Sequence, residues 1–585
     1  MSKNFLHRID QVANKVLNSP AQTPTGHQVS APYSFTALAP PSFPSCPGTS
    51  ILMDCRSEVS LTVDNYARGW TGRDIRSRSR GLSLSNIPQL LTSADCSSCV
   101  RCDEGFLITI DILPDDVLLE IFDFHLRDQR GIDSIERWIT LAHVCRRWRT
   151  VVFQSPLRLD LHLDCTPKTR ARDTLEIWPP LPLVIHYNCR NDNETIVVDN
   201  IIAALEHNHR VRQIELFWFS GPEWEYVANS AAMRKPFPEL TDLMLMADEY
   251  DESGPILPDS FLGGTAPRLE SLHLELVPFP GLPRLLLSAT HLVYLQLDDI
   301  PRSGYIPPEA MATSLSALTS LESLHLLFYY PPPRPALGSR HPPPLTHSIL
   351  PNLTHIQFRG TSEYFEEILA RIDAPRLNNL DITFFNQLIF NTPQLFRLIN
   401  RRPTLRTLKK GYITFSDGAI RVRFPLQTSE YRGLSVGIGC TASDWQLSSL
   451  AQVCASSLPP VSTLEDLYIL EDQYWGPDWQ DDVENTLWLD LLRSFPPVKN
   501  LYLSREFVPR IAPALEELVG GRTTEVLPAL ENIFSEEPPG SIHKGVQRFI
   551  SARRLTSHPV AVSTGQRMIV NSCIHVPHLC PFDLL

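Results

Sequence analysis

Residues 267–297 read PRLESLHLELVPFPGLPRLLLSATHLVYLQL and contain one apolar pattern twice. The pattern places leucines at relative positions 0, +3 and +5, as Leu269/Leu272/Leu274 and as Leu292/Leu295/Leu297. Side chains of a β-strand alternate between two faces, so the last two leucines of each triplet point to the same side. The first leucine lies on the turn that enters the strand and closes the core. Each triplet therefore predicts one short strand with an apolar inner face.

The same triplet recurs along most of the chain. Further copies are Val211/Ile214/Leu216, Leu240/Leu243/Leu245, Leu321/Leu324/Leu326, Leu353/Ile356/Phe358, Leu377/Leu380/Ile382, a weak Leu405/Leu408, Tyr431/Leu434/Val436, Leu464/Leu467/Ile469, Val498/Leu501/Leu503 and a degraded Leu530/Ile533. Successive copies lie 23 to 34 residues apart, which is the spacing of leucine-rich repeats. The pattern predicts an α/β solenoid over residues 208–536, with one parallel strand per repeat and each repeat packed on its neighbours.

Two departures predict an irregular solenoid. The Asn or Cys expected three residues after the last leucine is replaced by Val277, Ile300, Tyr329 and Thr361. In the weak repeat, Lys410 occupies a position that the pattern assigns to an inward apolar side chain. A non-repeat α/β fold therefore stays open as an alternative.

A second informative stretch, residues 112–152, precedes the repeats and reads ILPDDVLLEIFDFHLRDQRGIDSIERWITLAHVCRRWRTVV. Pro114 suits the first position of a helix, and Asp115 follows in the first turn, where the helix dipole favours negative charge. One apolar face then follows at helical spacing, formed by Val117, Leu118, Ile121 and Phe122. A second helix is expected from about Ser134 and a third around Trp148. Three helices this short bury little apolar surface, so they need a partner or a staple.

Three blocks of this stretch, residues 113–118, 121–122 and 144–149, resemble the F-box in order and spacing. The F-box is the helical module that attaches substrate receptors to SCF-type cullin–RING ubiquitin ligases. The resemblance implies that the helices bind a Skp-type adaptor while the repeats bind a protein substrate. The residues that it assigns to the partner-binding face and the packing behind it are Leu113, Pro114, Val117, Ile121, Phe122, Val144, Cys145 and Trp148.

Together, the two features resemble the F-box and leucine-rich-repeat-like proteins abundant in mushroom-forming fungi, whose characteristic tail residues 545–563 also resemble. Substrate recognition is then expected on exposed residues of the concave strands, between the inward leucines. Examples are Glu215, His273, Gln296 and His325. The alternative is a leucine-rich-repeat scaffold without a ubiquitin role, in which the F-box-like helices only cap the solenoid.

The remaining segments complete the expected organisation. Residues 1–106 are rich in Ser, Pro, Thr and Arg without sustained periodicity and are predicted to be disordered. The F-box spans residues 107–156, and residues 157–207 connect it to the repeats. Residues 537–585 form a C-terminal tail.

The formal net charge of −13 disfavours a general nucleic-acid binder, which needs a basic surface. No apolar run approaches the ~20 residues of a membrane helix, and the N-terminus lacks a signal core, so a cytoplasmic and/or nuclear location is expected. The twelve cysteines are interpreted as free thiols.

Several patterns suggest an enzyme or a metal site but are incomplete. Cys96, Cys99 and Cys102 have metal-like spacing without a neighbouring fourth ligand. Residues 437–440 are a fragment of a phosphate loop without its Lys-Ser/Thr end. The acidic cluster 478–484 is interpreted as a solvated face. The sequence therefore predicts no catalytic residues, no metal and no cofactor.

Overall fold

The computed structural model of the 585-residue chain describes most of the part from Leu113 to Thr564. The described residues are 113–127, 141, 144–154, 161–177, 182–188, 194–219, 221–247, 256–332, 347–387, 390–406, 408–427, 429–440, 443–458, 463–472, 483–536 and 543–564. The N-terminal segment, its three spaced cysteines, most of the second F-box helix and most of the acidic cluster lie outside them. The chain divides into two compact units, residues 1–114 and 115–585.

The F-box-like stretch forms two described helices, α2 (Asp115–Arg127) and α4 (Arg146–Gln154). Asp115 is in the first turn of α2, directly after Pro114, and α4 contains Trp148, around which the third helix is expected. The buried side chains of α2 and α4 are apolar: Leu118, Leu119, Phe122, Val151 and Val152, and Leu141 between the two helices is buried as well. Burial of these side chains is the main force that holds such short helices together.

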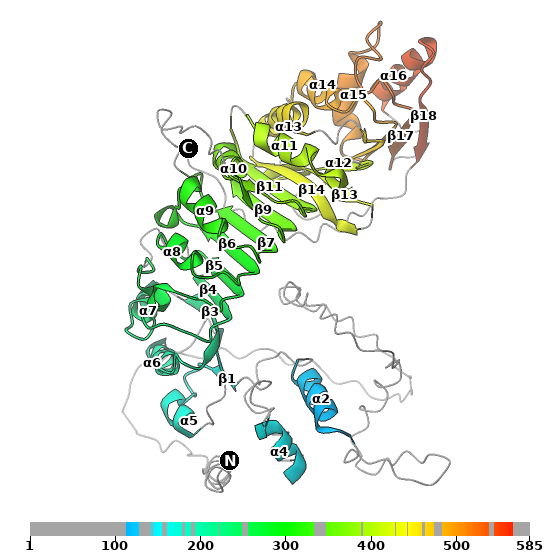
Figure 1. The fold of residues 1–585 in the computed structure, drawn as a ribbon. Helices are drawn as coiled ribbons and strands as arrows, with labels where there is room; N and C mark the ends of the chain where they lie inside the picture. Colours follow the sequence, from blue (N-terminus) through cyan, green and yellow to red (C-terminus); the bar gives the residue numbers. More distant parts are fainter. Residues whose placement is uncertain are drawn as a thin grey trace, which may run out of the picture. The chain divides into compact units, whose positions relative to one another are not determined.

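Sixteen strands of the described residues form one sheet, in the order β1-β2-β3-β4-β5-β6-β7-β9-β11-β14-β13-β12-β15-β16-β17-β18 (Figure 1). Their bounds are β1 Leu161–Asp164, β2 Leu183–Asn188, β3 Val211–Phe219, β4 Asp242–Ala247, β5 Ser271–Glu275, β6 Tyr294–Ile300, β7 Ser323–Phe328, β9 His355–Gly360, β11 Asn379–Phe385, β12 Lys410–Ser416, β13 Ala419–Leu426, β14 Ser429–Gly439, β15 Asp466–Glu471, β16 Asn500–Leu503, β17 Asn532–Ser535 and β18 Ala561–Thr564. A separate pair joins β8 (Ser348–Ile349) to β10 (Ile372–Asp373). All strand pairs of the large sheet are parallel except those of β13 with its two neighbours. The predicted α/β fold with a mainly parallel sheet is confirmed.

The leucines of successive triplets pair in register across the sheet. Leu272 of β5 lies between Leu243 of β4 and Leu295 of β6, and the +5 leucines follow the same alignment. Leu272 is 1% exposed. The 0/+3/+5 pattern thus generates a continuous apolar face, because every inward position of one strand meets an inward position of the next.

Helices return along the inward face of the sheet and cover its leucines (Figure 1). They are α5 Ala171–Ile177, α6 Glu194–Leu205, α7 Gly221–Ala228, α8 Leu282–Leu286, α9 Pro308–Leu315, α10 Ser362–Leu369, α11 Pro393–Asn400, α12 Pro403–Arg406, α13 Ser443–Ser457, α14 Asn485–Arg493, α15 Val508–Glu516 and α16 Lys544–Leu555, with short 3-10 turns at Phe261–Gly264 and Arg302–Gly304. Several return helices start at a proline, as in α9 and α11, where the missing N–H has no helical partner to lose.

The sheet departs from one strand per repeat at β12, β13 and β14. After β11, the next strand in the chain, β12, does not pair with β11. Strand β13 runs back antiparallel to β12, and β14 then occupies the position next to β11, so the order in the sheet is β11-β14-β13-β12. Gly411 and Ile413 of β12 align with the inward Leu467 and Ile469 of β15. Lys410 is exposed. The expectation that Lys410 takes an inward position is therefore wrong. The inward positions of β12 include Gly411 and Ile413, which follow in sequence the positions that the leucine triplet assigned.

The sheet also extends beyond the predicted repeat range at both ends. Strands β1 and β2 lie within the expected connector, and α16 and β18 lie within the expected tail. Because each added strand hydrogen-bonds the one before it, the sheet continues where the leucine triplet has faded. Within the described residues, no helix is long and apolar enough to span a bilayer.

Candidate functional site

The helical module combines a buried contact with exposed apolar side chains. The ring of Phe122 on α2 packs against the ring of Trp148 on α4 and is 1% exposed. By contrast, Val117 on α2 is 39% exposed and Val144, just before α4, is 59% exposed. Within the described part of the helical module, these two valines are the large apolar side chains that stay exposed.

The structure divides the eight predicted F-box residues into three groups. Phe122 is buried, whereas Leu113, Ile121, Cys145 and Trp148 are half-buried and Pro114, Val117 and Val144 are exposed. The exposed residues are the stronger candidates for partner contact, since a buried ring is already covered by its own chain.

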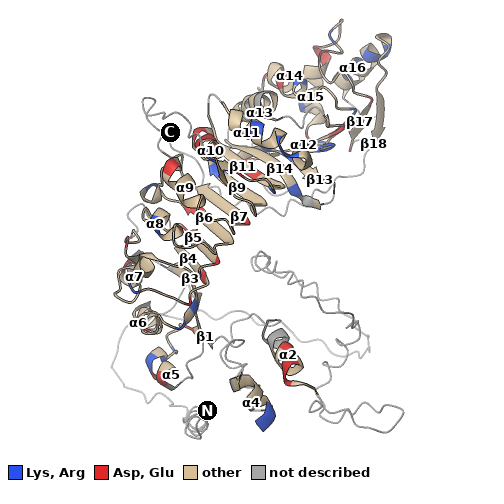
Figure 2. Cartoon of the chain, viewed as in Figure 1, with Lys and Arg blue, Asp and Glu red and all other residues tan. Residues whose placement is uncertain are grey.

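One ion pair joins α4 to α2, and one local hydrogen bond caps the start of α4. Arg147 donates from Nη2 to Oδ1 of Asp115 at 2.7 Å and from Nε to the same oxygen at 3.1 Å. The backbone N–H of Trp148 donates to Cys145 Sγ at 3.4 Å. The predicted core role of Cys145 is thus supplemented by a cap on the first turn of α4. Asp115 is the first residue of α2 and Arg147 the second of α4; Figure 2 shows acidic residues on α2 and basic residues on α4.

The second candidate region is the outer face of the sheet. The four predicted substrate residues occupy one row across the strands, in which His273, Gln296 and His325 lie on the adjacent strands β5, β6 and β7. Glu215 on β3 is separated from them by Met244 on β4. The four residues thus lie at matching positions of the outer face, but they are less accessible than expected.

His273 is the clearest correction to the expected exposure. Its side chain is 8% exposed, and Glu215, Gln296 and His325 are half-buried. Long side chains on neighbouring parallel strands cover one another, so a position on the open face is not necessarily solvated. The roles of these residues in substrate binding stay predictions.

His273 and Gln296 lie in a compact polar group with Glu275 and Asp298, two acids that the sequence analysis did not single out. The Nε2 of His273 is 3.5 Å from Oδ2 of Asp298 and 3.8 Å from Oε2 of Glu275. Glu275 pairs in register with Asp298, and Gln296 Nε2 donates to Asp298 Oδ2 at 2.6 Å. The sequence does contain a signal for this group. Two successive strands each carry polar residues two positions apart, His273 and Glu275 on one and Gln296 and Asp298 on the other, and residues at this spacing point to the same face of a strand.

Burial and mutual charge shift the acids of this group in opposite directions. Burial raises the pKa of Glu275 to about 7; His273 opposes this shift, while Asp298 and Asp299 add to it. Burial alone would also raise the pKa of Asp298, but His273 and the hydrogen bond from Gln296 lower it below its ordinary value. Clustered groups with divergent pKa values are a recognised mark of functional sites.

Further along the same face, polar side chains pair across strands. His325 and His355 have ring centroids 4.9 Å apart, and Asn379 Nδ2 donates to His355 Nδ1. Burial, with His325 and Arg432 adding and Asp381 opposing, lowers the pKa of His355 to about 4. His355 is therefore neutral at pH 7.

Aromatic rings continue the outer face toward the C-terminal end of the sheet. Tyr412, Tyr468, Tyr502 and Phe534 lie on successive strands of the sheet order β12, β15, β16 and β17. Their ring centroids are 4.6, 4.1 and 4.4 Å apart, with near-parallel planes. Such a ladder offers a flat surface of the kind that protein interfaces use, because aromatic side chains are enriched in interface cores. The leucine triplets did not predict this ladder of rings, because the triplets describe inward positions and the rings occupy outward ones.

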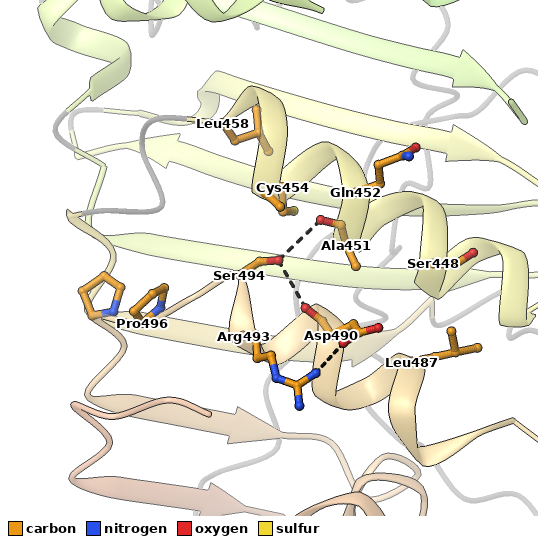
Figure 3. Close-up of a pocket in the computed structure, with 12 residues that line it drawn as sticks. Ser448, Ala451, Gln452, Cys454, Leu458, Leu487, Asp490, Arg493, Ser494 and Pro496 are labelled. Atoms are coloured by element: carbon orange, nitrogen blue, oxygen red, sulfur yellow. Dashed lines mark hydrogen bonds and ion pairs between the residues drawn. The ribbon is translucent and has the colours of Figure 1, made fainter. Parts of the chain in front are cut away.

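A groove of about 1020 Å³ lies between α13 and α14 on the helical side (Figure 3). Ser494 Oγ donates to the carbonyl of Ala451 at 3.4 Å and to that of Asp490 at 3.3 Å. Cys454 also lines the groove, and burial raises the pKa of its thiol far above the ordinary value. A thiol held protonated is a poor nucleophile, so the groove offers packing surface rather than an activated group.

Comparison with known proteins gives a family match for one segment of the chain. Residues 110–163 match the F-box-like family. A search of curated proteins finds no match. Among solved structures, the leucine-rich repeat-containing protein LegL7 from Legionella pneumophila is similar at 14% identity and a TM-score of 0.24, over 68% of this chain and 98% of that chain.

The chain therefore carries an F-box-like domain followed by a leucine-rich-repeat-like α/β sheet.

Proposed function

We propose that this protein is a substrate receptor of an SCF-type cullin–RING ubiquitin ligase. The supporting observation is the F-box-like match at residues 110–163, in which apolar side chains such as Val117 and Val144 stay exposed. A Skp-type adaptor would cover them and remove their apolar surface from water.

The outer face of the sheet would bind the protein substrate. It offers two kinds of surface, the polar row around His273 and Gln296 and the stacked rings around Tyr502. The receptor would act by proximity: it raises the effective concentration of substrate lysines near the conjugating enzyme and performs no bond chemistry itself. The proposed site of action is the cytoplasm, the nucleus or both.

Co-purification of the full chain with a Skp-type adaptor and a cullin tests this function. We expect the wild-type chain to retain the adaptor and the double variant Val117→Asp/Val144→Asp to lose it, because two charges would be buried without partners. Ile196→Asp is a matched control, since Ile196 is 48% exposed on α6 of the solenoid, and this variant is expected to retain the adaptor.

If the wild-type chain shows no adaptor binding, the receptor function fails. The protein would then be better described as a leucine-rich-repeat scaffold whose F-box-like helices act as a cap. Equal adaptor binding by the wild type and the Val117→Asp/Val144→Asp variant would instead show that these two residues are not part of the adaptor interface.

A further inference from the structure

The side chains of His273, Glu275 and Asp298 converge on one point of the outer sheet face. His273 and Glu275 are two residues apart on β5 and therefore project from the same face. Asp298 projects beside them from the adjacent strand β6, where it pairs in register with Glu275. One ligand-type atom from each of the three lies within 4.8 Å of the other two.

The group is deeply placed and its hydrogen bonds are incomplete. The side chains of His273, Asp298 and Glu275 are 8%, 14% and 22% exposed. Within the described part of the chain, both ring nitrogens of His273 and Oδ1 of Asp298 are buried without a hydrogen-bond partner. The approaches of 3.5 and 3.8 Å between His273 and the two carboxylates are too long for good hydrogen bonds.

Buried polar atoms without partners are rare and need an explanation, and an ion at the site is one of the recognised ones. We propose that His273, Glu275 and Asp298 bind one divalent transition-metal ion, with Zn²⁺ as the cation that fits their chemistry. The inference is independent of the proposed ubiquitin-ligase function, because it rests only on the geometry of β5 and β6.

The donor set selects the class of metal. One imidazole nitrogen with two carboxylate oxygens suits Zn²⁺ and related first-row ions, whereas Mg²⁺ and Ca²⁺ prefer oxygen ligands alone. In a tetrahedral zinc site, ligand atoms about 2.1 Å from the metal lie ~3.4 Å from one another. The observed 3.5 and 3.8 Å approaches are close to that value, so small side-chain rotations would complete the geometry.

The surroundings provide the outer support that metal ligands usually have. Gln296 Nε2 donates to Oδ2 of Asp298 at 2.6 Å and so holds this carboxylate beside His273. Hydrogen bonds of this kind orient ligating carboxylates and are a regular part of metal sites. Three protein ligands also leave a fourth position for water or for a donor atom of a bound partner.

Metal binding by the full-length chain tests the proposal. The chain is treated with a chelator, and Zn²⁺ binding is measured by titration calorimetry and by metal content after gel filtration. We expect one site that is weakened by at least about tenfold in each of the isosteric variants Glu275→Gln and Asp298→Asn. Zn²⁺ is also expected to raise the melting temperature of the wild type but not of Glu275→Gln, since a ligand that binds only the folded state stabilises it.

Two controls separate this site from other zinc ligands. His186 forms a similar pair with Asp164 at 2.8 Å on β2 and β1, so His186→Gln is expected to leave Zn²⁺ binding unchanged. Cys99→Ser tests the spaced cysteines, and binding that persists in this variant but falls in Glu275→Gln supports the proposal. Mg²⁺ is expected to give no comparable signal.

Three outcomes would overturn the inference. They are a wild-type chain that binds no Zn²⁺, unchanged affinity in both isosteric variants, and a stoichiometric zinc that is lost with Cys99→Ser alone. Circular dichroism of Glu275→Gln and Asp298→Asn verifies that both variants are folded. In the first case, the cluster is only an ion pair between His273 and its neighbouring carboxylates.

Discussion

The ring of Phe122 on α2 lies 4.7 Å from the ring of Trp148 on α4, with their planes inclined at 56°. This tilted contact joins the first and last parts of the F-box-like stretch, which are separated by a long segment of chain. Aromatic pairs of this geometry stabilise by about 0.5–1.5 kcal/mol beyond the area that they bury. The two residues therefore contribute to the packing of α4 on α2.

The first prediction concerns Phe122. Phe122→Ala removes a buried ring, and the free energy of unfolding of the helical module is expected to fall by about 3–5 kcal/mol. Adaptor binding would then be lost because the module unfolds. Val117→Asp is expected to leave helical content unchanged while adaptor affinity falls at least about tenfold. Circular dichroism and adaptor titration of the two variants decide the assignment, and equal loss of helix in both would contradict it.

A second prediction concerns the inner face of the sheet. Leu272→Asp places an unpaired carboxylate in the core of β5, with an expected cost of several kcal/mol, about 3–5. Increased protease cleavage between residues 240 and 330 would show that neighbouring repeats open with it. Leu287→Asp is the matched control, since Leu287 is 51% exposed at the end of α8. Resistance to proteolysis like that of the wild type in Leu272→Asp would show that this leucine does not support the core.

The sequence was sufficient to predict most of the sheet, for a local reason. A triplet such as Leu269/Leu272/Leu274 marks one turn and one strand, and it also indicates which residues of that strand align with the leucines of the next strand. Each repeat contacts only its neighbours. The prediction therefore required no knowledge of distant contacts.

Long-range pairing is where the prediction failed. In the sheet, β14 rather than β12 pairs with β11, because the chain turns back through β13. The inward residues of a single strand do not determine which of the two strands pairs with β11. The metal-type cluster was missed for a related reason. Glu275 and Asp298 are ordinary outward residues in sequence, and they converge with His273 only when two strands are placed side by side.

The third prediction concerns acid stability. The pKa of His355 is lowered from 6.5 to about 4, so the folded state favours the neutral ring. The stability that it contributes is present above pH 6.5 and is lost as the pH falls from 6.5 toward 4. His355→Gln keeps an acceptor for Asn379 and is expected to reduce the fall in melting temperature between pH 7 and pH 4.5.

His186 provides a comparison of opposite sign. Burial lowers its pKa, but the hydrogen bond with Asp164 and the charges of Glu215 and Asp164 raise it more, and the net pKa is above 6.5. Its contribution is present below pH 6.5 and is lost as the pH rises through the raised pKa. His186→Gln is thus expected to lower stability most at acidic pH. Identical pH profiles for the two variants would contradict both assignments.

The last prediction concerns the C-terminal end of the sheet, where Arg553 of α16 is fully buried. Its guanidinium donates to four backbone carbonyls of the loop before β17: those of Thr523, Leu527, Pro528 and Leu530, at 3.0–3.4 Å. Loss of these charge-assisted hydrogen bonds leaves buried carbonyls unpaired, so Arg553→Met is expected to cost at least about 3 kcal/mol. Arg554→Met is the matched control, because the next side chain is exposed. Hydrogen exchange of β17 and β18 measures the effect: faster exchange in Arg553→Met alone supports a structural cap, and equal exchange in both variants would show that the arginine does not hold this end of the sheet.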